Sequence, residues 1–160
     1  LELEVKTTVS SSRRHQISSL QQLKQSDGFT LYLVSVLLGK SADGRTLPEL
    51  VNQVRGLVPE GRRGELDQQL EHYGRAPGYR DDHALFYNQR LIQRRPIAAI
   101  PVDGNLPAFN SAIVADLFGK HAAERLLEMS YKLDLEGLGW EDTSPSFVRR
   151  LPMIAPIGKS

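Results

Sequence analysis

The 160-residue chain contains no cysteine. This absence excludes disulfides, zinc sites with thiolate ligands and cysteine nucleophiles, and it is compatible with a reducing cytoplasm, where we expect the protein. Histidine is also scarce, and His72, His83 and His121 have no partners at the spacing of a zinc site. The sequence therefore carries no pattern of a structural zinc centre.

Long apolar runs and a strong net charge are missing as well. The longest apolar run, residues 31–38, is far shorter than the about 20 residues needed to cross a bilayer, so we expect no membrane partner. The formal net charge is only +1, so any nucleic-acid surface must come from local basic clusters. Short clusters of this kind are Arg13-Arg14-His15, Arg62-Arg63, Arg90 with Arg94-Arg95, and Arg149-Arg150.

The first eight residues carry the clearest pattern in the chain. Apolar and charged residues alternate over residues 1–6, which is the period of a strand with one buried and one charged face. We expect Leu1, Leu3 and Val5 to pack under at least one helix. Glu4 and Lys6 would project from the other face, roughly 6.5–7 Å apart along the strand. A divalent metal held by Glu4 could then share one phosphate with Lys6.

This strand and its surroundings resemble a known family. Residues 4–8 (EVKTT) followed by residues 12–23 resemble the second half of the PD-(D/E)XK nuclease signature, and they are similar to the bacterial domain family known as PD-(D/E)XK motif proteins. Residues 105–110 and 129–135 resemble the C-terminal half of that family. The resemblance implies an α/β fold with a mixed central sheet, flanking helices and a restriction-endonuclease-like core. It also implies a Mg²⁺-dependent endonuclease acting on DNA in a bacterial restriction or phage-defence system.

The resemblance gives three residues of the first strand a catalytic role. Glu4 would be a ligand for Mg²⁺ or Mn²⁺, and the backbone carbonyl of Val5 would complete the metal site. Lys6 would lower the pKa of the attacking water or stabilise charge on the phosphate. The alternative is a charged strand edge that simply faces solvent.

Further residues are expected to contact nucleic acid. Arg13, Arg14 and His15 follow the strand closely enough to reach the same phosphate or its neighbours. The resemblance adds Gln22, which matches a position where many members of the superfamily place a helical Gln or basic residue. All four could equally be caps and surface groups. The serines at residues 10–12 invite a reading as a nucleophilic hydrolase, but no Gly-x-Ser-x-Gly elbow accompanies them.

The family's first metal-binding Asp lies on a strand that precedes the Glu-x-Lys strand. Nothing precedes it here, and the chain has no initiator Met. We therefore expect the C-terminal part of a longer protein, a homodimer, or association with a chain that carries the missing part. Alone, the chain should be weakly active, or a catalytically inert module for DNA binding or protein assembly. The acids that could replace the missing one are Asp27, Asp81, Asp82 and Asp103.

The remaining pattern predicts one nuclease-like domain over residues 1–136 and an irregular tail over residues 137–160. A central strand over 29–38 should pair parallel with the first strand. Thr46 and Glu49 have the spacing of a capping box at the start of a helix. The other expected elements are helices at 17–27, 47–58 and 65–73, an edge strand at 94–102, a turn and short helix within 106–118, and a last strand at 126–135.

Overall fold

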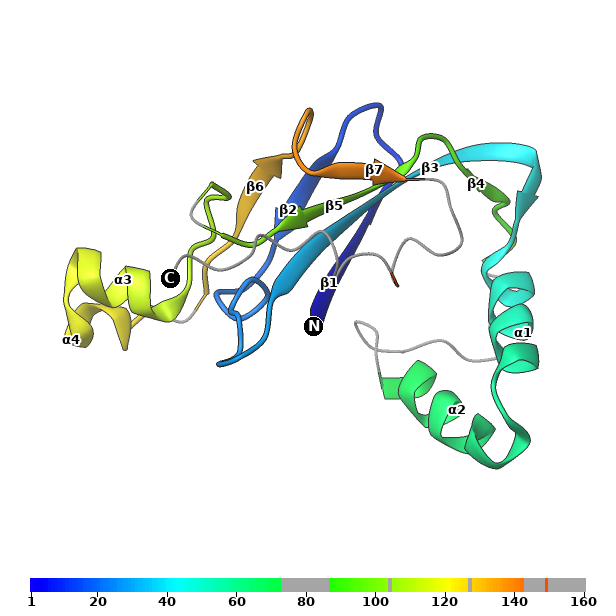
Figure 1. Cartoon of the computed structure of the whole chain (residues 1–160), viewed down its shortest axis with the longest axis horizontal. Helices are drawn as coiled ribbons and strands as arrows, with labels where there is room; N and C mark the ends of the chain where they lie inside the picture. Colours follow the sequence, from blue (N-terminus) through cyan, green and yellow to red (C-terminus); the bar gives the residue numbers. More distant parts are fainter. Residues whose placement is uncertain (73–86, 104, 127, 143–148, 150–160) are drawn as a thin grey trace. The chain divides into compact units, whose positions relative to one another are not determined.

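The structure is a computed structural model, and it describes residues 1–72, 87–103, 105–126, 128–142 and 149. The chain divides into two compact units (Figure 1). Unit 1 comprises residues 1–38 and 93–160, and unit 2 comprises residues 39–92. The predicted domain boundaries stay a prediction. None of the described helices has the length and apolar character needed to span a membrane.

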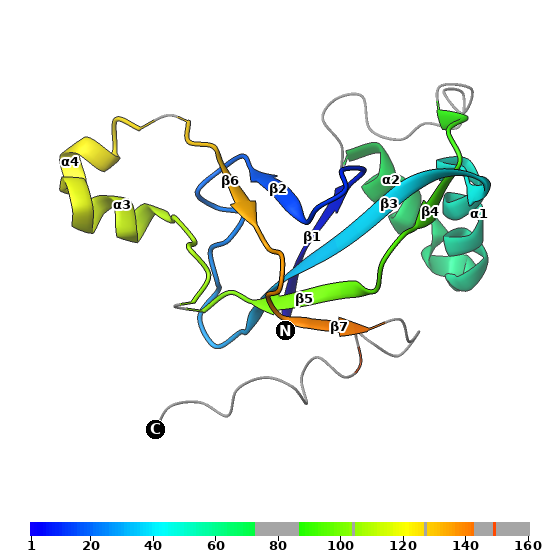
Figure 2. The same cartoon turned by 90° about the horizontal axis from the view of Figure 1, so that it is seen from above.

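A mixed sheet forms the frame of unit 1. Its strands run in the order β1 (Glu2–Thr8), β3 (Leu31–Arg45), β5 (Ile97–Pro101) and β7 (Trp140–Asp142). β3 continues into unit 2, to which most of its other partner, β4 (Leu91–Gln93), also belongs. β1 is parallel to β3, whereas β5 is antiparallel to both of its neighbours (Figures 1 and 2). The fold is therefore α/β with a mixed sheet, as predicted.

The apolar, β-branched run at the start of β3 makes it the central strand. Residues 31–35 are all buried, so this part of β3 is covered on both faces. The predicted parallel pairing of β1 with β3 is confirmed, with Glu4 opposite Leu33 and Lys6 opposite Ser35. Paired residues in a parallel ladder point to the same face, so Glu4 and Lys6 lie on the face of Leu33 and Ser35.

The packing predicted for β1 is wrong. Leu1, Leu3 and Val5 are 45%, 38% and 55% exposed, and the charged residues are the more sheltered ones. The main core lies on the charged face, because Leu33 of β3 belongs to it. Alternation has the same period whichever face is turned inward, so it could not reveal that the charged face of β1 is the inner one.

A strand and the turn after it are found where a helix was predicted at 17–27. β2 (Arg14–Ile17) pairs antiparallel with β6 (Tyr131–Asp134), and a turn follows β2 (Figure 2). Ile17 and Leu23 have helical spacing, but they lie at the two ends of this turn, and both side chains are buried there. The distant partner β6, which local spacing cannot reveal, decides the structure of this segment.

Two apolar clusters cover the two faces of the sheet in unit 1. The larger one joins the sheet to the β2–β6 pair, and its buried members are Ile17, Leu23, Leu33, Ala98, Ile100, Leu106, Leu133 and Leu135. The smaller cluster contains Tyr32, Val34 and Ala99 on the opposite face, with Trp140 packed against it. Glu4 and Lys6 thus stand at the margin of the larger core.

β5 and β7 depart from the predicted pattern. β5 lies between β3 and β7, not at an edge as predicted, because Pro101 occupies its last position and does not interrupt the ladder. β7 places residues 140–142 in the sheet, where an irregular tail was predicted. Gly139, before β7, has a φ of 76°, and a Cβ there would collide with the carbonyl of Ala99.

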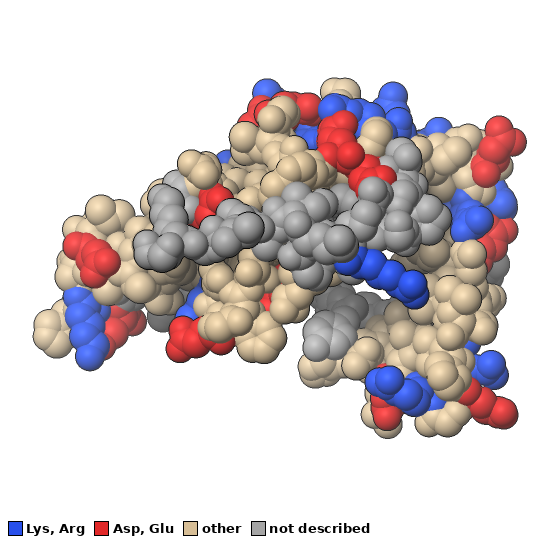
Figure 3. All heavy atoms as spheres, viewed as in Figure 1, with Lys and Arg blue, Asp and Glu red and all other residues tan. Residues whose placement is uncertain are grey.

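Unit 2 contains α1 (Leu47–Leu57), the short helix η1 (Glu60–Arg62) and α2 (Arg63–His72). The predicted capping box is confirmed: Thr46 and Glu49 each accept the other's backbone N–H through their side chains. Residues 73–86 lie outside the described residues. Basic and acidic side chains are interspersed on the face drawn in Figure 3, which agrees with the small net charge.

Candidate functional site

Glu4 and Lys6 share the inner face of β1, as predicted. Lys6 Nζ lies 3.3 Å from Glu4 Oε1, and the side chain of Lys6 is 17% exposed while that of Glu4 is 27% exposed. Both groups are therefore sheltered by protein but still reachable from solvent. A carboxylate and an ammonium in this state can hold a cation and an anion side by side.

Gln22 is the second partner of Lys6. Lys6 Nζ donates to Gln22 Oε1 at 2.9 Å, and the backbone N–H of Ser18 donates to the same oxygen at 2.9 Å. The sequence predicted Gln22 near the site but on a helix, whereas it stands on the turn after β2. The structure thus brings Glu4, Lys6 and Gln22 together.

The backbone carbonyl of Val5 points to the outer edge of β1. The N–H of Glu2 donates to the carbonyl of Thr30 at 2.9 Å, and alternate residues of a parallel strand pair toward the same neighbour. Glu4 and Lys6 therefore pair toward β3, and the carbonyl of Val5 faces the opposite edge. Within the described part of the chain, β1 has no strand neighbour on that edge. No strand among the described residues therefore pairs with this carbonyl.

Arg13 has a different role from the predicted contact with nucleic acid. Its side chain is 1% exposed, and it donates to the carbonyls of Ser35 and Pro96 and to the carboxylate of Glu141, 2.9 Å away. These acceptors lie on β3, on β7 and next to β5. Arg13 thus clamps β2 to the sheet, and its guanidinium is not available to a phosphate.

His15 is also buried, at 3% exposure, and its Nε2 lies 2.7 Å from Ser35 Oγ. Burial lowers its pKa most, and the charges of Lys6 and Arg13 lower the pKa further. The lowered pKa favours the neutral ring, and the tautomer of that ring decides whether His15 Nε2 accepts from the Ser35 hydroxyl or donates to it. Burial removes His15 from direct contact with a phosphate, contrary to the prediction.

Arg14, the neighbour of Arg13, faces solvent. Its side chain is 67% exposed, and its Nε donates to Asp134 Oδ2 at 2.9 Å. The pKa of Asp134 is lowered, first by the backbone N–H of Glu136 and then by Arg14. An exposed pair of this kind is weak, so Arg14 can exchange Asp134 for a phosphate at little cost.

Sequence reasoning missed Ser35 and the acids that hold the arginines. Ser35 is fully buried and joins Arg13 to His15, and its only sequence signal is a polar residue inside an apolar run. Arg95 donates to both Glu136 and Glu141. The pKa of Glu136 is lowered by the backbone N–H of Arg13 first and by Arg95 second. No local pattern marks these acids, because their partners lie far away in the sequence.

A second metal-binding acid is not evident in the described part of the chain. No three His, Asp or Glu side chains gather there closely enough to hold a metal ion. Asp27 and Asp103 are exposed, and Asp81 and Asp82 lie outside the described residues. The candidate site therefore consists of Glu4, Lys6, Gln22 and the carbonyl of Val5.

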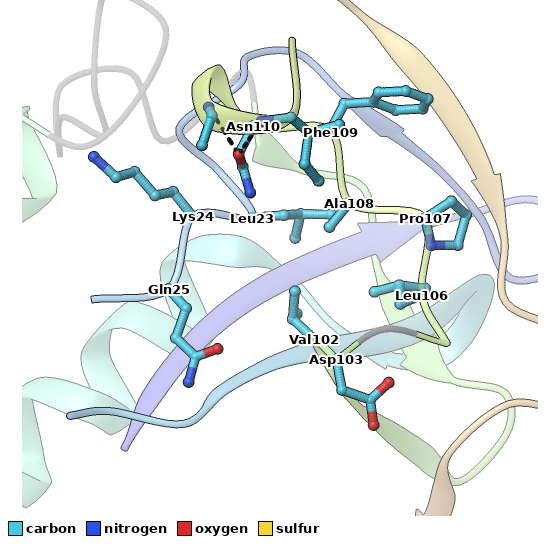
Figure 4. A pocket seen from close by; sticks show the side chains of 12 residues that line it. Leu23, Lys24, Gln25, Val102, Asp103, Leu106, Pro107, Ala108, Phe109 and Asn110 are labelled. Atoms are coloured by element: carbon cyan, nitrogen blue, oxygen red, sulfur yellow. Dashed lines mark hydrogen bonds between the residues drawn. The ribbon is translucent and has the colours of Figure 1, made fainter. Parts of the chain in front are cut away.

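An open pocket of about 690 Å³ lies in unit 1 (Figure 4). It begins at Leu23, directly after Gln22, and reaches α3 (Ser111–Phe118), which precedes α4 (Lys120–Ala123). Asn110 caps α3 by accepting two backbone N–H groups at 3.0 Å, which agrees with the predicted turn and helix. The pocket is mostly apolar, and neither Glu4 nor Lys6 lines it.

The mixed sheet and the paired Glu4 and Lys6 on β1 define a nuclease-like α/β protein. The family model described as "Putative PD-(D/E)XK family member, (DUF4420)" matches residues 1–136. The chain belongs to this family, as the resemblance in the sequence predicted. No curated protein and no solved structure matches the chain.

Proposed function

We propose that the chain is the Mg²⁺-dependent endonuclease domain of a bacterial restriction or phage-defence system, hydrolysing DNA phosphodiesters in the cytoplasm. The observation that carries the proposal is the half-sheltered pair of Glu4 and Lys6 on the inner face of β1. A charged pair that only made the protein soluble would be expected on the exposed face instead. Membership of the PD-(D/E)XK family supports the same reaction class.

The residues present fit a divalent metal in part. Mg²⁺ keeps several waters and is commonly held by one or two carboxylates. Glu4 would supply one carboxylate and Val5 one carbonyl, which is the smallest number of carboxylates such a site uses. When bound, Mg²⁺ or Mn²⁺ would polarise the scissile phosphoryl oxygen and activate a water. A second acid from a partner would complete the set, and the open edge of β1 supports its approach there. That partner would be a second copy of this chain or another chain that supplies an acid.

Different residues of the chain would then contact the scissile phosphate and its neighbour. Lys6 would stabilise the negative charge that develops on the phosphoryl oxygens, because its ammonium is preorganised and partly shielded from water. Arg14 would bind a neighbouring phosphate from the exposed face of β2. Arg13 and His15 are left to hold β2 in place.

The test compares Glu4→Ala and Lys6→Ala with Thr7→Ala, whose side chain lies on the opposite, exposed face of β1. In the form of the protein that cleaves plasmid DNA, we expect each of the first two changes to lower the metal-dependent cleavage rate by at least about a hundredfold. Thr7→Ala should cleave like the wild type, and circular dichroism should find all three folded. Equal rates of plasmid nicking by the wild type and Lys6→Ala would contradict the catalytic role of Lys6.

A second candidate function is an inert nuclease-fold module that binds DNA or a protein. It is favoured by the single carboxylate in the candidate site. Calorimetric titration of Mn²⁺ into the chain separates the two functions. We expect binding only at about millimolar Mn²⁺, strengthened in a form that supplies the second acid. DNA binding that is indifferent to Mn²⁺ in every form would favour the inert module.

A further inference from the structure

The side chain of Gln22 is oriented by the backbone, independently of Lys6. The N–H of Ser18 donates to Gln22 Oε1 at 2.9 Å. The nitrogen of an amide side chain carries only donors, so this bond fixes the oxygen end of Gln22 toward Ser18. The same oxygen accepts from Lys6 Nζ at 2.9 Å. Lys6 therefore meets an acceptor whose direction is already set.

The turn that carries Gln22 is anchored at both ends. Ile17 before it is fully buried, and Leu23 after it is 2% exposed, and both belong to the larger core. The N–H of Gln22 also donates to the carbonyl of Ser19 at 3.4 Å inside the turn. An anchored turn holds a side chain more precisely than a free loop does.

We propose that Gln22 is the positioning residue of Lys6 in the cleavage reaction, an inference that rests on the proposed function. Lysine has a flexible four-carbon stem, so its ammonium needs a fixed acceptor to stay in one place. Glu4 supplies one acceptor at 3.3 Å, but a carboxylate that binds a metal has less charge to offer Lys6. Gln22 is neutral and keeps its oxygen on Lys6 throughout. This role replaces the direct contact with nucleic acid that the sequence predicted for Gln22.

The first test measures how readily the Lys6 amine reacts, and it needs no cleavage. The folded chain is pulsed with acetic anhydride, and mass spectrometry compares acetylation of Lys6 with that of Lys40, an exposed lysine in unit 2. Gln22→Ala removes the acceptor and should raise Lys6 acetylation about threefold to tenfold. Gln22→Glu keeps an oxygen acceptor, so Lys6 should react no faster than in the wild type.

Gln21→Ala is the matched control, because Gln21 lies on the same turn but is exposed, and its side-chain amide donates to Ser111 Oγ at 3.4 Å. It should leave Lys6 acetylation unchanged. Gln22→Met, which keeps the length of the side chain without a strong acceptor, repeats the comparison if Gln22→Ala disturbs the turn. Equal Lys6 acetylation in the wild type and in both of these Gln22 variants would overturn the proposal.

The second test separates positioning from DNA binding. In the form of the protein that cleaves DNA, Gln22→Ala should lower kcat with KM nearly unchanged, and Gln22→Glu should recover part of the lost rate. A higher KM with an unchanged kcat would mean that Gln22 binds DNA, which overturns the positioning role. If no form of the protein cleaves DNA, the proposed function fails, while the acetylation result still decides whether Gln22 holds Lys6.

Discussion

Arg13 and Lys6 are two cations that point into the same unit, and they differ in what surrounds them. The Arg13 side chain is 1% exposed and donates to two backbone carbonyls and a carboxylate. The Lys6 side chain is 17% exposed and has two acceptors, Glu4 and Gln22. The first arrangement uses a charge to join strands, whereas the second leaves a charge within reach of a ligand.

The difference teaches how a structural charge can be told from a functional one. A buried charge must be fully paired, because an unpaired one is costly in a medium of low dielectric constant. In the described part of the chain, no buried side-chain polar atom lacks a hydrogen-bond partner. Arg13 meets that demand with protein groups alone, so it has nothing left for a substrate. Lys6 is partly exposed to solvent, so its ammonium can exchange a protein acceptor for a ligand.

The sharpest way to break the comparison is to remove each charge and measure stability. Arg13→Met should lower the free energy of unfolding by about 2–4 kcal/mol, because two carbonyls and Glu141 lose their buried donor. Lys6→Met should cost less than about 1 kcal/mol. Urea denaturation followed by circular dichroism measures both values.

Arg14→Met is the matched control, because Arg14 is the neighbour of Arg13 but is 67% exposed. It should change stability by no more than about 0.5 kcal/mol. If Lys6→Met destabilises the protein as much as Arg13→Met does, the division between structural and functional cations is wrong.

His15 sharpens the comparison, because its pKa is lowered by burial and by the charges of both Lys6 and Arg13. The unfolded chain takes up this proton near pH 6.5, before the folded protein does. Stability from neutral His15 is therefore complete above pH 6.5 and is lost as the pH falls below that value, by up to about 1.4 kcal/mol per pH unit.

Urea unfolding at several pH values from 7.5 to about 5 tests this prediction. His15→Gln keeps a side chain that can bond to Ser35 but does not titrate, so its stability should depend less on pH in this range. His121→Gln, in which a fully exposed histidine is replaced, should behave like the wild type. Equal pH dependence in His15→Gln and the wild type would contradict the assignment.

The smallest effect is expected on the outer face of β1. Val5 is 55% exposed and lies on the opposite face from Glu4 and Lys6. Val5→Thr keeps the β-branched shape, so the free energy of unfolding should change by less than about 0.5 kcal/mol. A loss above about 2 kcal/mol in urea denaturation would mean that this face is packed after all.

Sequence reasoning succeeded where the cause is local. The capping box of Thr46 and Glu49, the apolar run of β3 and the shared face of Glu4 and Lys6 all follow from neighbours in the sequence. It failed where a distant segment decides. Strand β2 was not predicted, and a helix was expected from its last residue onward, because its partner lies far away in the sequence, with Arg14 and Asp134 separated by 120 positions.

The prediction of which face of β1 is buried was wrong for a different reason. An alternating strand gives the same pattern whether its apolar or its charged face is turned inward, and here Ser35 and Leu33 of β3 decide. Arg13 was predicted to contact DNA because the sequence of an arginine pair does not show which of the two side chains is buried. The strand register separates Arg13 from Arg14, and that register is set by β6.

The outer edge of β1 has a consequence for handling the isolated chain. The backbone groups of Leu3, Val5 and Thr7 face an edge with no strand neighbour among the described residues, and the apolar side chains beside it are exposed. Natural sheets keep such edges from sticking together by placing charges on them, but the charges of β1 all lie on its inner face. We therefore expect concentrated samples to self-associate strand to strand through β1. The strand proposed to carry the chemistry would then also limit how far the protein can be concentrated.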